Sequence, residues 1–355
     1  MRLRALSPLL ATIILIAIVL SAGLVVYGML SGWMSTYSST LSVQPTSVDL
    51  VVAGDKALLS VSVKNTGNKP LAGIVVTGYD DNGKPFKLAL SPADPGQVSG
   101  NTLVIPLGVS NIVLDASGNN NHGTIYGATW VDGKVGGALS FDGVDDYVEV
   151  PDSPSLRWDM KPFTITFWAK ETTVREHELF RSTITTNVGY WRIWFSTGTG
   201  PLYFSTRSSD TNELLDFSAA VRPSGWFHAA LVREDPIWKW YLNGNLSATT
   251  TDTRTGRGMA FKGILIGAKL YTAYFNGLID EVRVYNRAFD GGEVSFSNAN
   301  PGLPPTRGLV AWYPMDEGTN APFSFTAGSS YALTITAYSL DGSVATQTLT
   351  IRATG

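Results

Sequence analysis

The sequence predicts an all-β protein preceded by one long, apolar N-terminal α-helix. The 355 residues include 36 glycines and 18 prolines, and with many Thr, Val and Tyr this composition favours short strands joined by turns. Several stretches beyond residue 40 alternate between apolar and polar residues, as half-buried strands do. Residues 9–30 carry no charge and are almost wholly apolar, which is the length of a membrane-spanning helix.

The overall composition excludes several classes of function. The formal net charge is -3, and no basic run occurs outside the opening MRLR, so the electrostatic signature of nucleic-acid binding is missing. The chain contains no cysteine, which rules out disulfides, thiolate metal sites and thiol catalysis. At 44% apolar residues, the chain is long enough to bury two cores.

The apolar N-terminal run has three interpretations. It follows Arg2 and Arg4 and continues to Met34, and the next charged residue is Asp49. It could be a cleaved secretory signal with its small residues at 21–23, a permanent anchor, or a leader cut on the cytoplasmic side of the run. Because the apolar pattern continues beyond the small residues, the secretory signal is the weakest of the three.

The first residues favour the third interpretation. The pattern RALSP at residues 4–8 resembles the short class III leaders of archaeal type IV pilins. The resemblance implies a leader at residues 1–5, cleaved between Ala5 and Leu6. Residues 6–40 would then form a helix that lies in the membrane before assembly and packs against copies of itself in a homo-oligomeric filament. Bacterial pilins usually carry Glu at the fifth mature position, where this chain has Leu10, so the likeness is to the archaeal branch.

A β-sandwich begins after this helix and stops too early. Residues 41–100 contain four strand-like runs separated by turn sequences such as DDNG, whereas an immunoglobulin-like sandwich needs about seven strands. The missing strands occur at residues 321–355, where Leu333 and Ile335 alternate with threonines around an LDGS turn. Joined together, the two pieces resemble an archaeal pilin head. We therefore predict a discontinuous head, with residues 101–320 inserted into it.

The inserted segment resembles the laminin G-like, concanavalin A-like jelly rolls. The resemblance rests on residues 113–151 and on FTITFWAK, WFHAALVR, WYLNGNLS and FNGLIDEVRVYNRAF. Domains of that family open with a strand of the type GLVAWYPMDEGTN, which here comes last, at residues 308–320. We therefore predict a circularly permuted domain, with residues 298–307 as linker and the displaced strand paired beside residues 279–285. A truncated second copy of the domain is the alternative.

Several oxygen-bearing side chains suggest a calcium site. Asp280 lies two residues before Val282 on a predicted strand, so both should lie on the same face. This would place a carboxylate at the edge of a core, where a bound cation could neutralise its charge. The stretch DASGNNNHG adds the hard oxygen ligands that Ca²⁺ prefers, and the resembled family often binds calcium in this region. The candidate ligands are Asp280, Asp115, Asn119 and Asn121. The alternative is that these side chains cap turns, and the sequence leaves both open.

No catalytic constellation is recognisable, so we expect no enzyme activity. The three histidines fall in no zinc-protease spacing and beside no nucleophile turn. Asp280 and Glu281 are neighbours on a predicted strand and should point to opposite faces, unlike a glycosidase pair.

Trp238, Trp240 and His228 are expected in the core rather than in a ligand site, and the acidic turn in FDGVDDYVEV is expected to be solvated. Asn245 begins an N-x-S sequon just past a hairpin turn and is a candidate glycosylation site.

Together these features predict a structural subunit of an archaeal type IV pilus-like filament at the cell surface. The subunit would display a lectin-like domain for adhesion, with glycans or other cell-surface ligands as partners and Ca²⁺ as a candidate cofactor. A membrane-anchored surface protein presenting a carbohydrate-binding module is the alternative, and an anchored glycosidase is a third.

Overall fold

The computed structural model describes residues 40–355 except 158–160, 184–188, 210, 256–262 and 268–272. The chain divides into two compact units, residues 1–40 and residues 41–355, and the second is described below. Ala5, Leu6 and the expected apolar helix lie outside the described residues, except for Thr40. Within the described part, helices of the length and apolarity needed to cross a membrane are not found. This part is an all-β sandwich protein with one short α-helix, α2 (Gly291–Ala299), which confirms the predicted β class.

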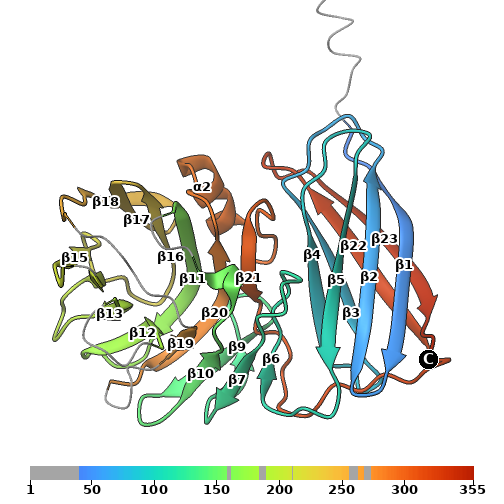
Figure 1. The fold of residues 1–355 in the computed structure, drawn as a ribbon, viewed down its shortest axis with the longest axis horizontal. Helices are drawn as coiled ribbons and strands as arrows, with labels where there is room; N and C mark the ends of the chain where they lie inside the picture. Colours follow the sequence, from blue (N-terminus) through green and yellow to red (C-terminus); the bar gives the residue numbers. More distant parts are fainter. Residues whose placement is uncertain (1–39, 158–160, 184–188, 210, 256–262, 268–272) are drawn as a thin grey trace, which may run out of the picture. The chain divides into compact units, whose positions relative to one another are not determined.

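The first sandwich, called the head below, combines strands from both ends of the described chain (Figure 1). Its three-stranded sheet has the order β1 (Val43–Ala53), β2 (Lys56–Asn65), β5 (Val98–Pro106), and its four-stranded sheet has the order β23 (Val344–Arg352), β22 (Ser330–Tyr338), β3 (Gly73–Tyr79), β4 (Pro85–Leu90). The two sheets enclose one core that includes Leu59, Val76, Leu103 and Leu333. β5, which spans the predicted boundary at residue 100, pairs along its length with β2, from Val98 opposite Lys64 to Pro106 opposite Lys56.

The second sandwich, called the jelly roll below, is made of two larger sheets packed through a core that contains Phe167, Ile193, Trp240 and Val284. The first, the β12 sheet, has the order β15 (Leu214–Ser218), β14 (Leu202–Arg207), β13 (Trp191–Phe195), β12 (His177–Ser182), β19 (Ile264–Ile266), β10 (Tyr147–Val150), β7 (Gly123–Tyr126), β6 (Ile112–Val113). The second, the β20 sheet, has the order β18 (Asn245–Thr251), β17 (Ile237–Leu242), β16 (Trp226–Glu234), β11 (Phe163–Glu171), β20 (Asn276–Tyr285), β9 (Gly137–Asp142), β8 (Thr129–Asp132).

The late strand β21 (Leu309–Tyr313) pairs antiparallel with β20, with Tyr313 opposite Val282 and Ala311 opposite Val284. The pairing predicted for GLVAWYPMDEGTN is therefore confirmed, and it brings residues far apart in the chain side by side. Val310, Ala311 and Tyr313 contribute to the jelly-roll core. The circular permutation and the boundaries of the domains remain predictions.

A β-bulge in β20 overturns the parity expected for Asp280. Glu281 has a φ of +52°, and the pairing of β11 with β20 shifts register at this point. A bulge adds one residue and breaks the period of two. Ile279 and Val282 therefore both belong to the core, while Asp280 and Glu281 are both buried outside it. The expectations that Asp280 shares a face with Val282 and that Asp280 and Glu281 point apart were wrong.

The head and the jelly roll share a small hydrophobic cluster. Val75 and Ala89 of the head pack with Trp312 of β21 and with Phe296 of α2. Lys87 of β4 forms an ion pair with Asp316, just after β21. Since these contacts are apolar as well as ionic, they hold the two sandwiches in a defined arrangement within the unit at residues 41–355.

Candidate functional site

The outer face of the β12 sheet carries a mixed aromatic and charged surface. Along β13, Trp191, Ile193 and Phe195 face the core, so Arg192 and Trp194 point to the opposite side. The outward-facing residues of β12, β13, β14 and β15 lie opposite one another and form two rows across the strands. One row is Glu178, Trp194, Tyr203 and Ser218, and the other is Arg181, Arg192, Ser205 and Asp216. We call these eight residues the platform; Glu178, Arg181 and Ser205 are buried in it, and the other five are partly or fully exposed.

The aromatic side chains of the platform are fixed by contacts with each other and with neighbours. The rings of Trp194 and Tyr203 stack with centroids 5.0 Å apart. Trp194 Nε1–H donates to Ser205 Oγ at 2.7 Å, and the Arg192 guanidinium lies 4.2 Å from the Trp194 ring centroid. Both rings are half-buried. A ring held in this way loses little freedom when a ligand stacks on it.

The charged side chains of the platform are joined to one another. Arg192 Nη1 donates to Glu178 Oε1 at 2.9 Å, and Arg181 Nη1 lies 3.4 Å from the same oxygen. Arg181 also lies over the ring of Tyr190, 4.8 Å from its centroid. Arginine and carboxylate groups beside aromatic rings offer hydrogen bonds together with an apolar surface, and this combination suits a ligand with hydroxyl groups and C–H faces.

The sequence interpretation missed the platform, although a signal was present. The runs YWRIWF and PLYFSTR alternate large apolar residues with polar or aromatic ones, so one face of each strand had to lie outside the core. Trp238 and Trp240 were considered from the sequence instead and were predicted to lie in the core, where both are fully buried. Which of the alternating aromatic residues faces outward depends on the neighbouring sheet, and the sequence does not show that sheet.

The candidate ligand Asp115 is engaged entirely by the protein. Its side chain is fully buried, and Oδ1 accepts hydrogen bonds from Ser117 N and from Trp312 N of β21, both at 2.9 Å. Its Oδ2 accepts from Asn121 N and Ser117 Oγ, also at 2.9 Å. Burial raises the pKa of this carboxyl group, against the lowering effect of these hydrogen bonds.

Asn119 and Asn121 bind the same strand. Both side-chain amides donate to Val310 O at 3.0 Å, and Asn121 Oδ1 accepts from Ser155 Oγ at 3.1 Å. Nearby, His122 Nδ1 accepts from Asp115 N and its Nε2 donates to Val104 O of the head. The loop thus holds the free edge of β21, as the turn-capping alternative predicts, and the calcium interpretation of these residues remains a prediction.

The structure places Asp280 apart from that network. Asp280 Oδ2 accepts from Lys134 N at 2.8 Å and from Val135 N at 3.1 Å, while its Oδ1 is buried without a hydrogen-bond partner among the described residues. Burial, with a contribution from the charge of Glu281, raises the pKa of Asp280 to about 8. Among the four predicted cation ligands, Asp280 thus carries a buried oxygen that has no hydrogen-bond partner in the described part of the chain.

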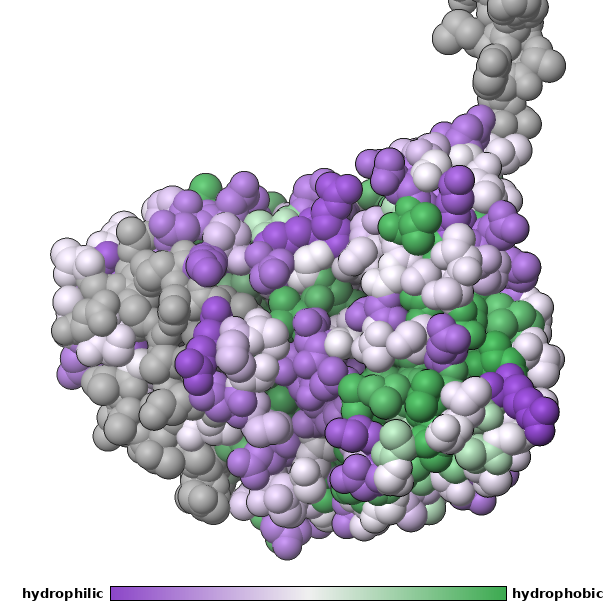
Figure 2. Space-filling model, turned by 45° about the vertical axis from the view of Figure 1, so that its right-hand side comes forward, coloured by the Kyte–Doolittle hydropathy of each residue, from purple (hydrophilic) through white to green (hydrophobic). Residues whose placement is uncertain are grey.

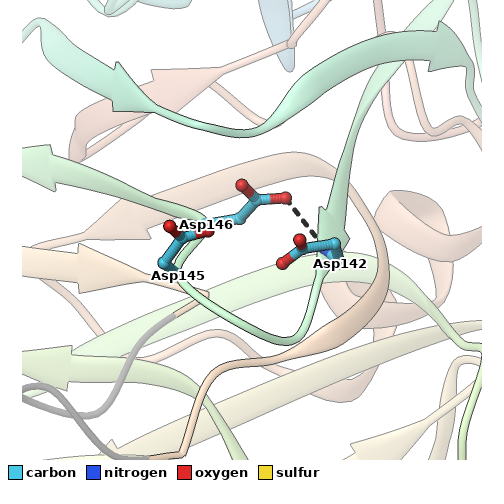
Figure 3. Close-up of side chains that lie close together, drawn as sticks. All are labelled: Asp142, Asp145 and Asp146. Carbon is cyan, nitrogen blue, oxygen red and sulfur yellow. Dashed lines mark hydrogen bonds between the residues drawn. The ribbon is translucent and has the colours of Figure 1, made fainter.

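An acidic turn offers a second arrangement of carboxylates, drawn in Figure 3. Oxygens of Asp142, Asp145 and Asp146, between β9 and β10, lie within 4.8 Å of one another. Asp146 Oδ2 accepts from Asp142 N at 2.8 Å, and Asp142 Oδ1 accepts from Val144 N at 2.7 Å. Asp142 and Asp145 are exposed, as expected for a solvated turn, but Asp146 is buried. Neither Asp115 nor Asp280 belongs to this group.

Two further sequence candidates are placed by the β20 sheet. Asn245 is exposed at the start of β18, directly after a turn in which Asn243 and Gly244 have positive φ, so its side chain is accessible. His228 is buried with neither ring nitrogen hydrogen-bonded to the described residues. Burial lowers the pKa of His228 to about 3, which makes the ring neutral, and it lies 5.5 Å from the ring of Trp168.

Comparisons with known proteins concern the jelly roll. The family described as the Concanavalin A-like lectin/glucanases superfamily matches residues 142–295. No curated protein matches the chain.

Three solved structures illustrate the likeness. Domain 4 of AbnA, a GH43 extracellular arabinanase from Geobacillus stearothermophilus in complex with arabinotriose, is 20% identical over 53% of this chain and 98% of its own, with a TM-score of 0.41. The binding domain of Paraclostridial Mosquitocidal Protein 1 is 17% identical over 54% of this chain and 51% of its own, with a TM-score of 0.41. The Ruminococcus gnavus IT-sialidase CBM40 bound to α2,3 sialyllactose is 19% identical over 44% of this chain and 94% of its own, with a TM-score of 0.34. The family match makes residues 142–295 similar to the concanavalin A-like lectins and glucanases.

Proposed function

We propose that this chain is a cell-surface protein that binds glycans on the platform of its jelly roll. The observation that carries the proposal is the stacked pair Trp194 and Tyr203 beside the Arg192–Glu178 ion pair. A saccharide presents C–H faces that stack on aromatic rings and hydroxyl groups that hydrogen-bond to the partly exposed Arg192 and the exposed Asp216, while the buried Glu178 holds Arg192 in place. The match to a lectin superfamily supports the same ligand class.

An array of immobilised oligosaccharides tests this proposal. The full chain is purified in a detergent without a sugar head group, because such head groups would compete for the platform. We expect Trp194→Ala to weaken binding by about three- to ten-fold, since an aromatic contact contributes about 0.5–1.5 kcal/mol. Trp226→Ala is the matched control, because Trp226 is a half-buried tryptophan at the start of β16 in the other sheet. Equal binding by both variants would refute the platform.

We further propose that the protein binds glycans without cleaving them. The adjacent carboxylates Asp280 and Glu281 are fully buried, so a sugar would not reach them, and this argues against the anchored glycosidase. Analysis of the array washings for released sugars tests this point. Products that disappear in an Asp280→Asn or a Glu281→Gln variant would establish hydrolysis.

For the assembly we propose a pilus-like filament at the cell surface, as the leader-like pattern RALSP suggests. The head offers a second point of support. Val51, Leu58 and Val104 oppose one another across β1, β2 and β5 and are half-buried, and Figure 2 shows apolar surface gathered over the head. An apolar row on an outer sheet face suits a contact with another subunit.

N-terminal sequencing of the mature protein and electron microscopy of sheared cell surfaces test the assembly. A start at Leu6, together with protein in filaments, is the expected result. A start at Met1 in membranes without filaments would favour the anchored carbohydrate-binding protein. A start near Ala22 or Gly23 would make it a secreted monomer.

Calcium remains a proposal, and among the predicted ligands the observation that supports it concerns Asp280. Asp280 Oδ1 is buried and unpaired among the described residues, and a cation there would compensate a carboxylate that burial otherwise disfavours. The Asp115 loop would contribute to the stability of β21 instead of to the metal.

A further inference from the structure

A groove runs between the head and the β8–β9 hairpin of the jelly roll. Its volume is about 800 Å³, within the range of pockets that hold small ligands. One wall comes from β3 and β4 of the head, the other from β8 and the following turn, and the base from the chain just after β21. The lining includes Tyr79, Lys87, Trp130, Asp132 and Asp316. None of these residues belongs to the platform.

The head supplies an exposed aromatic ring. Tyr79 ends β3, its residue is 55% exposed, and its hydroxyl makes no hydrogen bond to the described residues. Tyr79 lies opposite Pro85, and Thr77 lies opposite Lys87, so all four share the outer face of this sheet. Val76 and Leu88 point inward to the head core. A large aromatic residue at the end of an otherwise well-packed strand is not explained by the core.

The jelly roll supplies a second ring, held in place from two sides. Trp130 lies on β8, the edge strand of the β20 sheet, and packs partly against the jelly-roll core. Its Nε1–H donates to Asn320 Oδ1 at 2.8 Å. A ring that is already fixed and half-buried keeps one surface for a ligand and costs little entropy on binding.

Polar groups complete the groove. Lys87 pairs with Asp316 at its base, and Asp316 Oδ1 also accepts from Gly137 N at 2.8 Å, which fixes the turn between β8 and β9. Asp132 is exposed at the rim, and neither its carboxylate nor the hydroxyl of Thr77 has a hydrogen-bond partner among the described residues. The groove therefore combines two rings with hydroxyl, carboxylate and ammonium groups.

We propose that this groove is a second saccharide-binding site, built jointly by the head and the jelly roll. Tyr79 and Trp130 provide the surfaces on which sugar rings stack, and Asp132, Thr77 and the Lys87–Asp316 pair hydrogen-bond to the hydroxyl groups. An apolar ligand would leave these polar groups unpaired. Because the site needs a residue from each sandwich, it depends on the contact between them and does not exist in the isolated jelly roll.

The oligosaccharide array distinguishes this site from the platform. The full chain is compared with Trp194→Ala, Tyr79→Ala, their double variant and Tyr126→Ala, each checked for an unchanged melting temperature. Tyr126 is the matched control, since it is an exposed tyrosine of the jelly roll that does not line the groove. We expect Trp194→Ala to keep binding to some glycans. Tyr79→Ala should weaken that remaining binding by about three- to ten-fold, and Asp132→Ala should weaken it too.

Hydroxyl-radical footprinting gives a second readout on the glycans that the Trp194→Ala variant retains. The expected result is protection of Tyr79 and Trp130 without protection of Tyr126. The inference is overturned if Trp194→Ala removes all binding, which would leave the platform as the one site. It is equally overturned if the remaining binding survives in the double variant, or if the unsubstituted chain binds no glycan at all, an outcome that refutes the platform as well.

Discussion

The loop from Asp115 to Asn121 and the strand segment from Asp280 to Tyr285 are both buried and polar, and they differ in how their polar atoms are paired. In the loop, Asp115 receives four hydrogen bonds, and the side chains of Asn119 and Asn121 reach the backbone of β21. In the segment, several buried atoms have no hydrogen-bond partner among the described residues, namely Asp280 Oδ1, Glu281 Oε1, Arg283 Nε and Tyr285 Oη.

This difference shows that polar residues near a core serve two distinct purposes. The loop replaces a missing neighbouring strand, because its side chains bind the carbonyl and N–H groups that β21 would otherwise leave unpaired. The segment concentrates charge in a desolvated place, where Glu281 pairs with Arg283 and accepts from Trp312 Nε1. Buried polar atoms without partners are costly, so the segment is where water or a cation would be gained.

The largest expected effect is on the loop. Asp115→Ala should lower the free energy of unfolding by about 3–5 kcal/mol, because several donors lose their acceptor and each buried orphan costs about 1–3 kcal/mol. Urea denaturation measures the change. Asp132→Ala is the control, since an exposed carboxylate without a partner should matter by less than about 0.5 kcal/mol. Similar losses in both variants would mean that the loop is not what holds β21.

Calcium should act on the segment and not on the loop. At a free concentration about a hundred times its Kd, a cation bound only to the folded state adds about 2.7 kcal/mol, so the melting temperature of the unsubstituted chain should rise with calcium and fall back with chelator. Asp280→Asn should abolish the rise and Asp142→Asn should preserve it. The opposite pattern would place the calcium site at the acidic turn. If calcium does not raise the melting temperature of metal-stripped protein, the chain has no calcium site of this kind.

The pH dependence sharpens the contrast for Asp280. Burial, followed by the charge of Glu281, raises the pKa of Asp280 to about 8, above about 3.9 in the unfolded chain. The folded state therefore binds the proton more tightly, and this contribution to stability is full below about pH 4 and lost as the pH rises towards 8. In chelator, the stability difference between the unsubstituted chain and Asp280→Asn should fall by up to about 1.4 kcal/mol per pH unit. A constant difference would contradict the raised pKa.

The smallest expected effect concerns one member of the loop. Asn119→Ala should cost about 0.5–1.5 kcal/mol, at the lower end because Val310 O keeps Ser117 Oγ and Asn121 Nδ2 as donors. Denaturation beside Asn82→Ala, an exposed turn residue, gives the comparison. A loss as large as that of Asp115→Ala would show that Val310 O depends on Asn119 far more than shared bonding allows.

The sequence by itself predicted features that follow from local patterns. Alternation and turn residues predicted the β class, the hairpin at Asn243–Gly244 and the burial of Trp238 and Trp240. The likeness of GLVAWYPMDEGTN to an opening strand predicted its pairing with β20, although the two are separated by α2 and a linker. The predictions from alternation and turn residues held because they depend on the periodicity of a strand and on the φ preference of a turn residue, whereas the pairing of β21 with β20 came from the family resemblance.

Only the tertiary structure decided where the polar side chains point and what they contact. One inserted residue at the Glu281 bulge reversed the face of Asp280, and parity counting cannot detect a bulge whose position is set by the pairing of β11 with β20. The DASGNNNHG loop suits either calcium or turn capping, and only the tertiary structure shows that its side chains contact the free edge of β21, a strand far away in the sequence. The platform and the groove likewise arise from strands brought together by folding, because a binding surface depends on which faces remain after the cores are packed.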